Sequence, residues 1–172
     1  KQRNPLLKGI INELISNYYQ EQSDYYNAAL YAGKSVTNFE LFGANEIVLI
    51  AKRNSDNTPF GLLIFKNVDW RNRSADTNYA VGEKEFRQSA YGPEMTLLGL
   101  YWAFNSLNLH KLYGYILASN RASIGLAGFG GCKDGILKDY VPTADGFEDY
   151  VMYSLLKKEF DAFLLEQHHK SL

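Results

Sequence analysis

The stretch Arg87–Glu94, which reads RQSAYGPE, has residue types in an order that suits the binding of an anion. Gly92-Pro93 is a typical helix start, because proline has a preset φ and no N–H that needs a partner in the first turn. A helix that begins there directs several backbone N–H groups and the positive end of its dipole at the preceding loop. The stretch therefore predicts either a phosphate-binding loop or an ordinary turn before a helix.

Three carboxylates precede this loop and are candidates for a general base: Asp76, Glu83 and Glu85. A carboxylate that accepts a proton near neutral pH needs a raised pKa, which burial supplies. Most carboxylates at a protein surface are simply solvated. The charges of Glu83 and Glu85, so close to the loop, would oppose phosphate, and we expect both to face solvent. Asp76 is therefore the first choice as base, with Glu83 as its rival.

Two polar residues follow the apolar stretch Lys111–Ser119. Asn120 is suited to cap the next helix or to hydrogen-bond a ligand, and the sequence leaves both roles open. Ser123 has a hydroxyl that can donate a proton in catalysis or bond to a local carbonyl in the first helical turn.

Composition narrows the class of protein. The chain has 172 residues, of which 46% are hydrophobic, and a formal net charge of -1, which suits one compact domain over residues 1–172. No run of basic residues interleaved with aromatics appears, so we expect no nucleic-acid partner. No apolar run is long enough to cross a bilayer, so we expect no membrane partner either. The first residue is Lys1 and not methionine, so the sequence leaves open that the domain is part of a longer chain.

Histidine and cysteine are scarce. The three histidines show no metal-ligand spacing, so we expect no metal, and His110 is expected at the surface. The single cysteine, Cys132, agrees with a reducing compartment and hence with a cytoplasmic location. We expect Cys132 to pack as a small apolar residue and not to act as a nucleophile.

Hydrophobic periodicity predicts the elements that must position these residues. Helices are expected at 5–20, from Ser23 to Gly33, from Pro93 onward, at 123–128 and at 158–168; strands are expected at 46–53, 59–70, 76–83, 111–119, 134–141 and 148–156. The first three strands follow one another without a helix between them, as antiparallel neighbours do. The strand 111–119 is apolar on both faces, which indicates a central strand with helices packed over it. The predicted fold class is α+β, with a mixed, mostly antiparallel central sheet flanked by helices on both faces.

Several motifs together resemble the GNAT N-acetyltransferases and, within them, the RimJ/RimL-like branch. Arg87-x-x-Ala90-x-Gly92 fits the family's Gln/Arg-x-x-Gly-x-Gly/Ala loop at its first and last positions, with Ala90 in place of the middle glycine. The sequence Asn120 to Ile124 matches the branch's Asn-x-x-Ser-Ile. Further matches are Glu94, the pair Ala103-Phe104 and the turn Asn108-Leu109-His110-Lys111.

This resemblance implies that the chain binds acetyl-CoA (coenzyme A). The resemblance assigns the pantetheine arm to Asn120 and Ser123, and polarisation of the thioester to a backbone N–H around Ala80–Gly82, with Val81 at its centre. It assigns the pyrophosphate to a loop of six residues: Arg87, Gln88, Ser89, Ala90, Tyr91 and Gly92. Asp76 stands where several relatives carry a glutamate base. Many relatives place a tyrosine acid where this chain has Ala127, so the resemblance makes Ser123 the expected acid, unless water protonates the thiolate.

The function that follows is transfer of an acetyl group from acetyl-CoA to a primary amine. The expected partners are an acyl-CoA and an amine acceptor, either a small molecule such as a nucleotide-linked amino sugar or a protein N-terminus, with a homodimer left open. The alternative is a non-catalytic acyl-CoA-binding or regulatory domain. It is motivated by Ala90, by Ala127 and by the first forty residues, which lack the family's usual opening strand.

Overall fold

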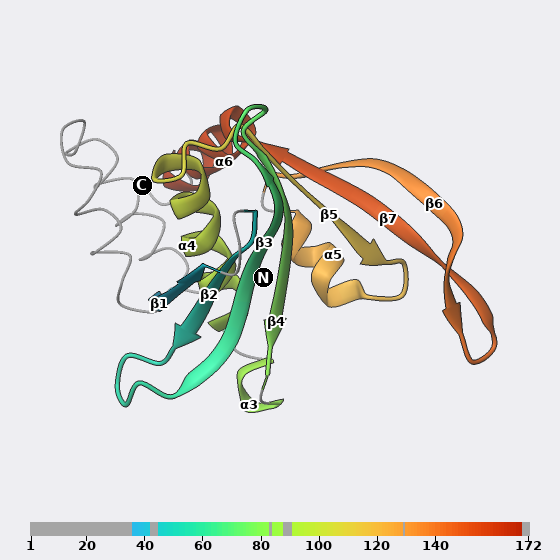
Figure 1. The fold of residues 1–172 in the computed structure, drawn as a ribbon, viewed down its shortest axis with the longest axis horizontal. Coiled ribbons are helices and arrows are strands. Elements are labelled where there is room, and N and C mark those ends of the chain that lie inside the picture. Colours follow the sequence, from blue (N-terminus) through green and yellow to red (C-terminus); the bar gives the residue numbers. More distant parts are fainter. Residues whose placement is uncertain (1–35, 42–44, 83, 88–90, 129, 170–172) are drawn as a thin grey trace.

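The computed structural model of the chain describes residues 36–41, 45–82, 84–87, 91–128 and 130–169. Seven strands form one sheet in the order β1-β2-β3-β4-β5-β7-β6 (Figure 1). The strands are β1 (Val36–Leu41), β2 (Ile47–Lys52), β3 (Pro59–Asp69), β4 (Ser74–Val81), β5 (Lys111–Leu117), β6 (Cys132–Thr143) and β7 (Gly146–Leu156). The helices are α3 (Lys84–Arg87), α4 (Tyr91–Asn105), α5 (Arg121–Ala127) and α6 (Lys157–His169).

The predicted fold class, α+β with a mixed and mostly antiparallel sheet, is confirmed. Helices were predicted on both faces of the sheet, whereas the described helices α4, α5 and α6 lie on one face. Every pair of neighbouring strands is antiparallel except β4 and β5, which are parallel. The predicted strands and helices from residue 46 onward all appear, with ends shifted by a few residues. Strand β1 was not predicted, and the predicted helices at 5–20 and 23–33 lie outside the described residues. Within the described part of the chain, no helix is long and apolar enough to span a membrane.

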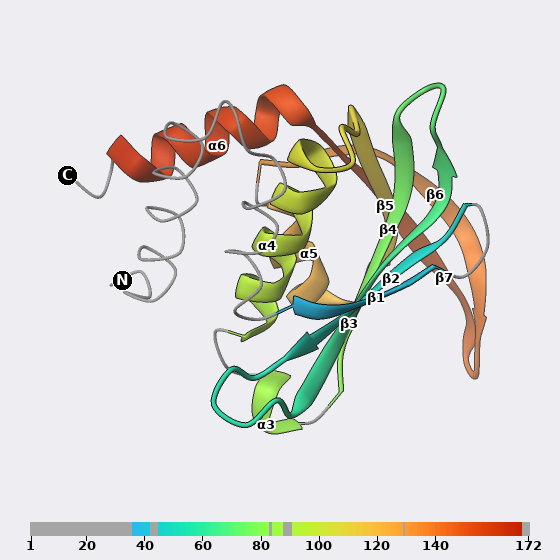
Figure 2. The ribbon, with the colours of Figure 1, turned by 60° about the vertical axis from the view of Figure 1, so that its left-hand side comes forward.

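One face of the sheet is covered by helices, with α4, α5 and α6 on the same side (Figure 2). The core lies between this face and α4, where Leu63 and Phe65 of β3 and Phe104 of α4 are at most 1% exposed. Gly99 lets α4 lie close to β3, since a Cβ at this position would stand 1.7 Å from Cδ2 of Leu63. Helix α6 joins the same core through Phe160, whose ring centroid is 5.4 Å from that of Phe104.

The other face of the sheet carries a row of tyrosines across β5, β7 and β6. Ring centroids are 6.3 Å apart for Tyr113 and Tyr115, 6.0 Å for Tyr115 and Tyr150, and 5.6 Å for Tyr150 and Tyr140. Tyr115 is 40% exposed and Tyr140 is 61% exposed. The tyrosine face of β5 is thus more open than its apolar sequence predicts, because tyrosine rings can pack on one another while their hydroxyls stay in water.

Candidate active site

Strands β4 and β5 part soon after they meet. They are paired only from Ser74–Asp76 to Lys111–Tyr113, and beyond these residues they diverge. On its other side β4 stays paired with β3 as far as Val81. The sheet therefore opens along the second half of β4.

The backbone of β4 turns polar groups toward this opening. The N–H of Gly82 donates to the carbonyl of Phe60 at 2.8 Å, which sets the alternation of the antiparallel ladder with β3. By that alternation, Tyr79 and Val81 direct their N–H and C=O groups away from β3. The Val81 carbonyl accordingly accepts a hydrogen bond from Nε of Arg87 at 3.1 Å. The edge of β4 that lost β5 is therefore available to a ligand with amide groups.

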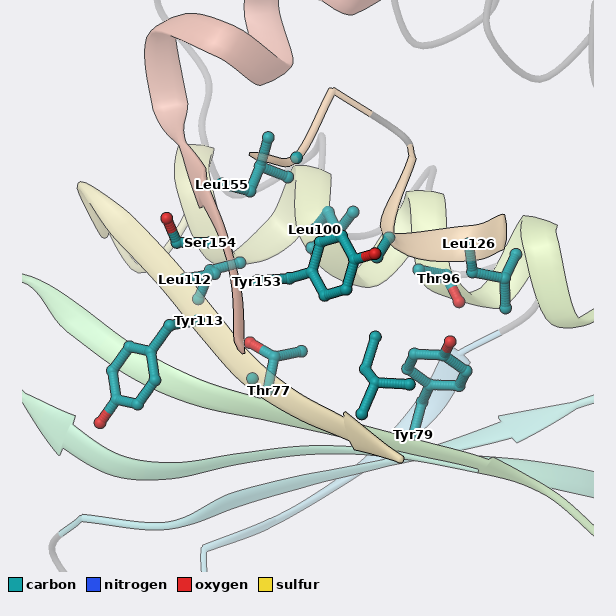
Figure 3. Close-up of a pocket in the computed structure, with 14 residues that line it drawn as sticks. Thr77, Tyr79, Thr96, Leu100, Leu112, Tyr113, Leu126, Tyr153, Ser154 and Leu155 are labelled. Atoms are coloured by element: carbon teal, nitrogen blue, oxygen red, sulfur yellow. The ribbon is translucent and has the colours of Figure 1, made fainter. Parts of the chain in front are cut away.

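A cavity of about 100 Å³ lies at the opening, on the helix-covered face (Figure 3). Its lining is mostly apolar and comes from β4, α4, β5, α5, the segment before β6, and β7: Thr77, Tyr79, Thr96, Leu100, Leu112, Tyr113, Gly114, Ile116, Leu126, Ala127, Gly131, Tyr153, Ser154 and Leu155. The hydroxyl oxygen of Thr77 is buried there and has no hydrogen-bond partner among the described residues. Because such groups are nearly always satisfied, this one marks a place for a ligand's donor.

Two tyrosines in this cavity were missed by the sequence analysis. The Tyr79 hydroxyl donates to the carbonyl of Ser123 at 3.3 Å, so it ties β4 to α5, and burial raises the pKa of its phenol. Tyr153 reaches the cavity from β7. Alternation along β7 places Tyr153 on the same face as Leu155, but the sequence does not say which face a cavity occupies.

Arg87 holds the start of the predicted phosphate loop against the end of β4. Its guanidinium donates to the carbonyl of Val81 at 3.1 Å and to that of Gly82 at 3.0 and 2.6 Å. The three residues that follow lie outside the described part of the chain: Gln88, Ser89 and Ala90. The Arg87 head group thus binds the backbone carbonyls of Val81 and Gly82.

Helix α4 begins at Tyr91, two residues before the predicted start. The Tyr91 ring packs against Phe60 and Phe86, with centroids 4.9 and 5.2 Å away. Gly92 lies beside β4, since a Cβ at this position would be 3.5 Å from Cγ2 of Val81. The N-terminus of α4 therefore stands next to the end of β4 at the mouth of the opening.

Asp76 lies at the last paired position of β4 with β5, opposite Tyr113. Its side chain points to the tyrosine face, because residues 77 and 79 of the same strand line the cavity on the other face. The carboxyl is half-buried, and burial raises its pKa against the opposing effects of a 3.1 Å hydrogen bond from Nδ2 of Asn78 and the charge of Lys66. The structure thus places Asp76 beside the opening but across the sheet from the cavity.

The rival carboxylates are placed differently. Glu85 is exposed, as predicted, and Glu83 lies outside the described residues. Glu85 is not among the residues that line the cavity.

Asn120 caps α5, which is one of the two roles the sequence left open. Its Oδ1 accepts a hydrogen bond from the backbone N–H of Ser123 at 3.1 Å. Ser123 itself is not among the residues that line the cavity, whereas Leu126 and Ala127 of the same helix are. The cavity wall at α5 is therefore apolar.

Cys132 corrects one prediction, and His110 agrees with another. We expected Cys132 to pack as an apolar residue, but it is exposed at the start of β6. Strand β6 is the last strand of the sheet and most of its residues are exposed, which local sequence does not reveal. His110 is exposed as predicted.

Comparison with known proteins agrees with this geometry. The model of the acetyltransferase (GNAT) domain matches residues 13–133. A Bacillus licheniformis protein described as uncharacterized N-acetyltransferase p20 is 28% identical over 118 residues, which are 68% of this chain and 65% of that protein. The chain therefore spans less than two thirds of the length of that relative.

Solved structures share the fold at low identity. A dodecameric spermidine N-acetyltransferase from Vibrio cholerae matches with a TM-score of 0.63 and 19% identity over 68% of each chain. A ribosomal-protein-S5-alanine acetyltransferase from Vibrio fischeri matches with a TM-score of 0.59 and 16% identity, over 67% of this chain and 63% of that one. The family match, the diverging strands and the cavity between them agree, and the chain belongs to the GNAT acetyltransferase family.

Proposed function

We propose that this chain transfers the acetyl group of acetyl-CoA to a primary amine, either of a small molecule or of a protein N-terminus. The observation that carries the proposal is the parting of β4 and β5, with an apolar cavity on one face and the half-buried carboxyl of Asp76 on the other. Such an opening brings a thioester and an amine together from opposite sides of one sheet.

The groups at the cavity suit the pantetheine arm of the acetyl-CoA donor. A pantetheine arm is a narrow apolar chain with two amides, and the backbone groups of Tyr79 and Val81 offer it a strand edge. Thr77 adds a buried oxygen without a partner. In this proposal the N–H of Val81 polarises the thioester carbonyl, since it points into the opening and depends on no side chain.

The phosphates of the donor are assigned to the loop Arg87–Gly92 and the start of α4. Unpaired N–H groups at a helix N-terminus attract anions. Arg87 supports this role by fixing the loop against the end of β4. Asn120 keeps a proposed contact with the pantetheine arm in addition to its capping bond.

The tyrosine face of the sheet suits the amine acceptor. Asp76 takes a proton from the ammonium form of the acceptor, and its raised pKa suits a base. Tyr113 is paired with Asp76, and the 40% exposed Tyr115 packs edge-on against Tyr113. Aromatic rings attract cations. A cationic amine is therefore the class of acceptor that this surface favours.

An amine panel with acetyl-CoA tests the proposal by the release of free CoA thiol. The panel contains spermidine, nucleotide-linked amino sugars and a short peptide with an N-terminal alanine, each compared with acetyl-CoA alone. We expect amine-dependent release with at least one of them, and mass spectrometry of the product to show one added acetyl group. CoA binding without release across the whole panel contradicts the proposal and points to a domain that only binds acyl-CoA.

Self-association and location complete the proposal. Strand β6 is an exposed edge with large apolar side chains, Ile136 and Tyr140 among them, and such edges pair with other chains. We propose a homodimer, to be measured by light scattering.

A single exposed cysteine fits a reducing compartment, and we propose the cytoplasm as the location of the protein.

A further inference from the structure

The proposed reaction leaves a thiolate on the donor, and the following inference rests on that proposed function. A side chain that protonates the thiolate must lie in the cavity, where the proposed function places the thioester. Among the described residues, six with hydroxyl groups line the cavity: Thr77, Tyr79, Thr96, Tyr113, Tyr153 and Ser154.

Four of these hydroxyls are engaged or point elsewhere. Thr96 donates to the carbonyl of Gly92 at 2.9 Å within α4. Tyr79 donates to the carbonyl of Ser123 at 3.3 Å. Ser154 hydrogen-bonds the carboxyl of Asp134 and lowers the pKa of that group. The Tyr113 ring extends to the opposite face (Figure 3).

Thr77 and Tyr153 remain, and their chemistry separates them. A phenol has a pKa of about 10, close to the value of about 8.5 for a thiol, so a proton passes between the two groups at little cost. A threonine hydroxyl does not titrate in water and serves better as a hydrogen-bond acceptor for a ligand amide.

The position of Tyr153 suits a proton donor. It is paired with Gly114 of β5, which has no side chain to stand between the ring and the opening. The Tyr153 ring projects from β7 into the cavity toward α5 (Figure 3). There the wall is Leu126 and Ala127, neither of which competes for the hydroxyl.

We propose that Tyr153 protonates the sulfur of the leaving CoA. The acceptor nitrogen forms the new C–N bond, the C–S bond breaks with its electron pair on sulfur, and the Tyr153 hydroxyl proton moves to sulfur. The ammonium gives up two protons: one passes to Asp76 before attack and then to solvent, and the second, carried by solvent, restores the phenol. The products are an amide, CoA thiol and one proton released.

Tyr153→Phe tests the donor because it keeps the ring and removes only the hydroxyl. We expect kcat to fall by roughly 10²- to 10⁴-fold, as for loss of a general acid, and the alkaline limb of the kcat profile to disappear. Affinity for acetyl-CoA by calorimetry should stay within a few-fold of the wild type. The matched control is Tyr140→Phe, in the edge strand β6 and 61% exposed, which should keep both kcat and its pH profile.

A second measurement does not depend on turnover. At about pH 9 much of the CoA thiol is ionised, and a hydrogen bond to a charged group contributes on the order of ten- to a hundredfold in affinity. Wild-type protein should therefore bind CoA more tightly than CoA that lacks its sulfur, and Tyr153→Phe should remove that preference.

The outcomes separate this inference from the proposed function. If the wild type prefers CoA and Tyr153→Phe loses the preference, the contact stands even when no amine is acetylated, and only the proposed function fails. If the wild type shows no preference, or if Ser123→Ala loses the preference and kcat while Tyr153→Phe keeps both, Tyr153 is not the donor.

Discussion

The two faces of the sheet differ in what covers them. On the helix side Leu63, Phe65 and Leu97 are at most 1% exposed, and α4 and α5 contribute mostly apolar walls to the cavity. On the other side Tyr115 and Tyr140 are 40% and 61% exposed, and Asp76 stands among charged and polar neighbours.

The difference explains how one sheet can serve two substrates of opposite character. An apolar wall strengthens each hydrogen bond that a thioester accepts, since the local dielectric is low. An open wall of tyrosines and a carboxyl admits a hydrated amine and attracts its charge. The opening between β4 and β5 connects the two faces of the sheet, so the proposed acetyl transfer must take place there.

Removing the carboxyl of Asp76 should give the largest effect on the open face. Asp76→Asn keeps the shape and loses the base, so we expect kcat/KM for the amine to fall roughly 10²- to 10⁴-fold and the acidic limb of its pH profile to vanish. CoA affinity, measured by calorimetry, should not change. Glu85→Gln is the control and should behave as wild type. A full loss in Glu83→Gln with normal turnover in Asp76→Asn would identify Glu83 as the base instead.

The same substitution should alter stability with a defined sign. Burial raises the pKa of Asp76 above its ordinary value of 3.8, so ionisation costs more in the folded chain than in the unfolded one. The stability that the Asp76 carboxyl contributes is fully present below pH 3.8 and is lost as pH rises through the folded-state pKa. The melting temperature of Asp76→Asn should therefore rise above that of the wild type over this pH range, and the difference should remain at neutral pH. An equal melting temperature at every pH would show that Asp76 is solvated.

Adding charge at Gly92 should weaken donor binding without touching the open face. Gly92→Asp places a carboxylate where the proposed pyrophosphate lies, and we expect CoA affinity to fall at least about tenfold by calorimetry. Gly92→Asn is the matched neutral control. A Cβ has ordinary room at this position, 3.5 Å from Cγ2 of Val81, so the control should retain most of the affinity. Unchanged affinity in Gly92→Asp would remove the loop from the donor site.

Filling the contact between α4 and β3 tests how tightly the helix face is packed. Gly99→Ala puts a methyl group 1.7 Å from Cδ2 of the buried Leu63, and overpacking of this kind costs about 1–3 kcal/mol of unfolding free energy. Gly125→Ala in α5 is the control, since a Cβ there meets nothing within 4 Å, and it should gain up to about 1 kcal/mol from helix propensity. Urea denaturation measures both. Equal unfolding free energies of the two variants would mean that the contact between α4 and β3 accommodates the added methyl group without cost.

Truncating the tyrosine row should have the smallest effect. Tyr115→Ala removes a ring near Asp76, and loss of a cation–π contact of about 0.5–1 kcal/mol predicts a rise of roughly two- to fivefold in KM for a cationic amine. KM for acetyl-CoA should stay constant. Tyr140→Ala, at the β6 end of the row, is the control and should leave both values unchanged. A rise in KM for acetyl-CoA alone would place the donor on the open face.

The sequence by itself determined the elements whose causes are local. Helix and strand periodicity located β2 to β7 and the described helices α4, α5 and α6, because side-chain alternation is repeated within each segment. Capping was one of the two roles that the sequence left open for Asn120, and the bond that its side chain accepts from the Ser123 N–H shows this role. The sequence did not predict strand β1 or the exact start of α4.

Only the tertiary structure decided which face each residue serves. Alternation says that Asp76 and Thr77 point to opposite sides, but helix packing decides that the side with Thr77 is the closed one. Tyr153 reaches the cavity because it pairs with Gly114 of β5, which lies 39 residues earlier in the chain (153 − 114). Cys132 is exposed in β6, which is the last strand of the sheet. Contacts between distant segments set both results, and no local pattern carries that information.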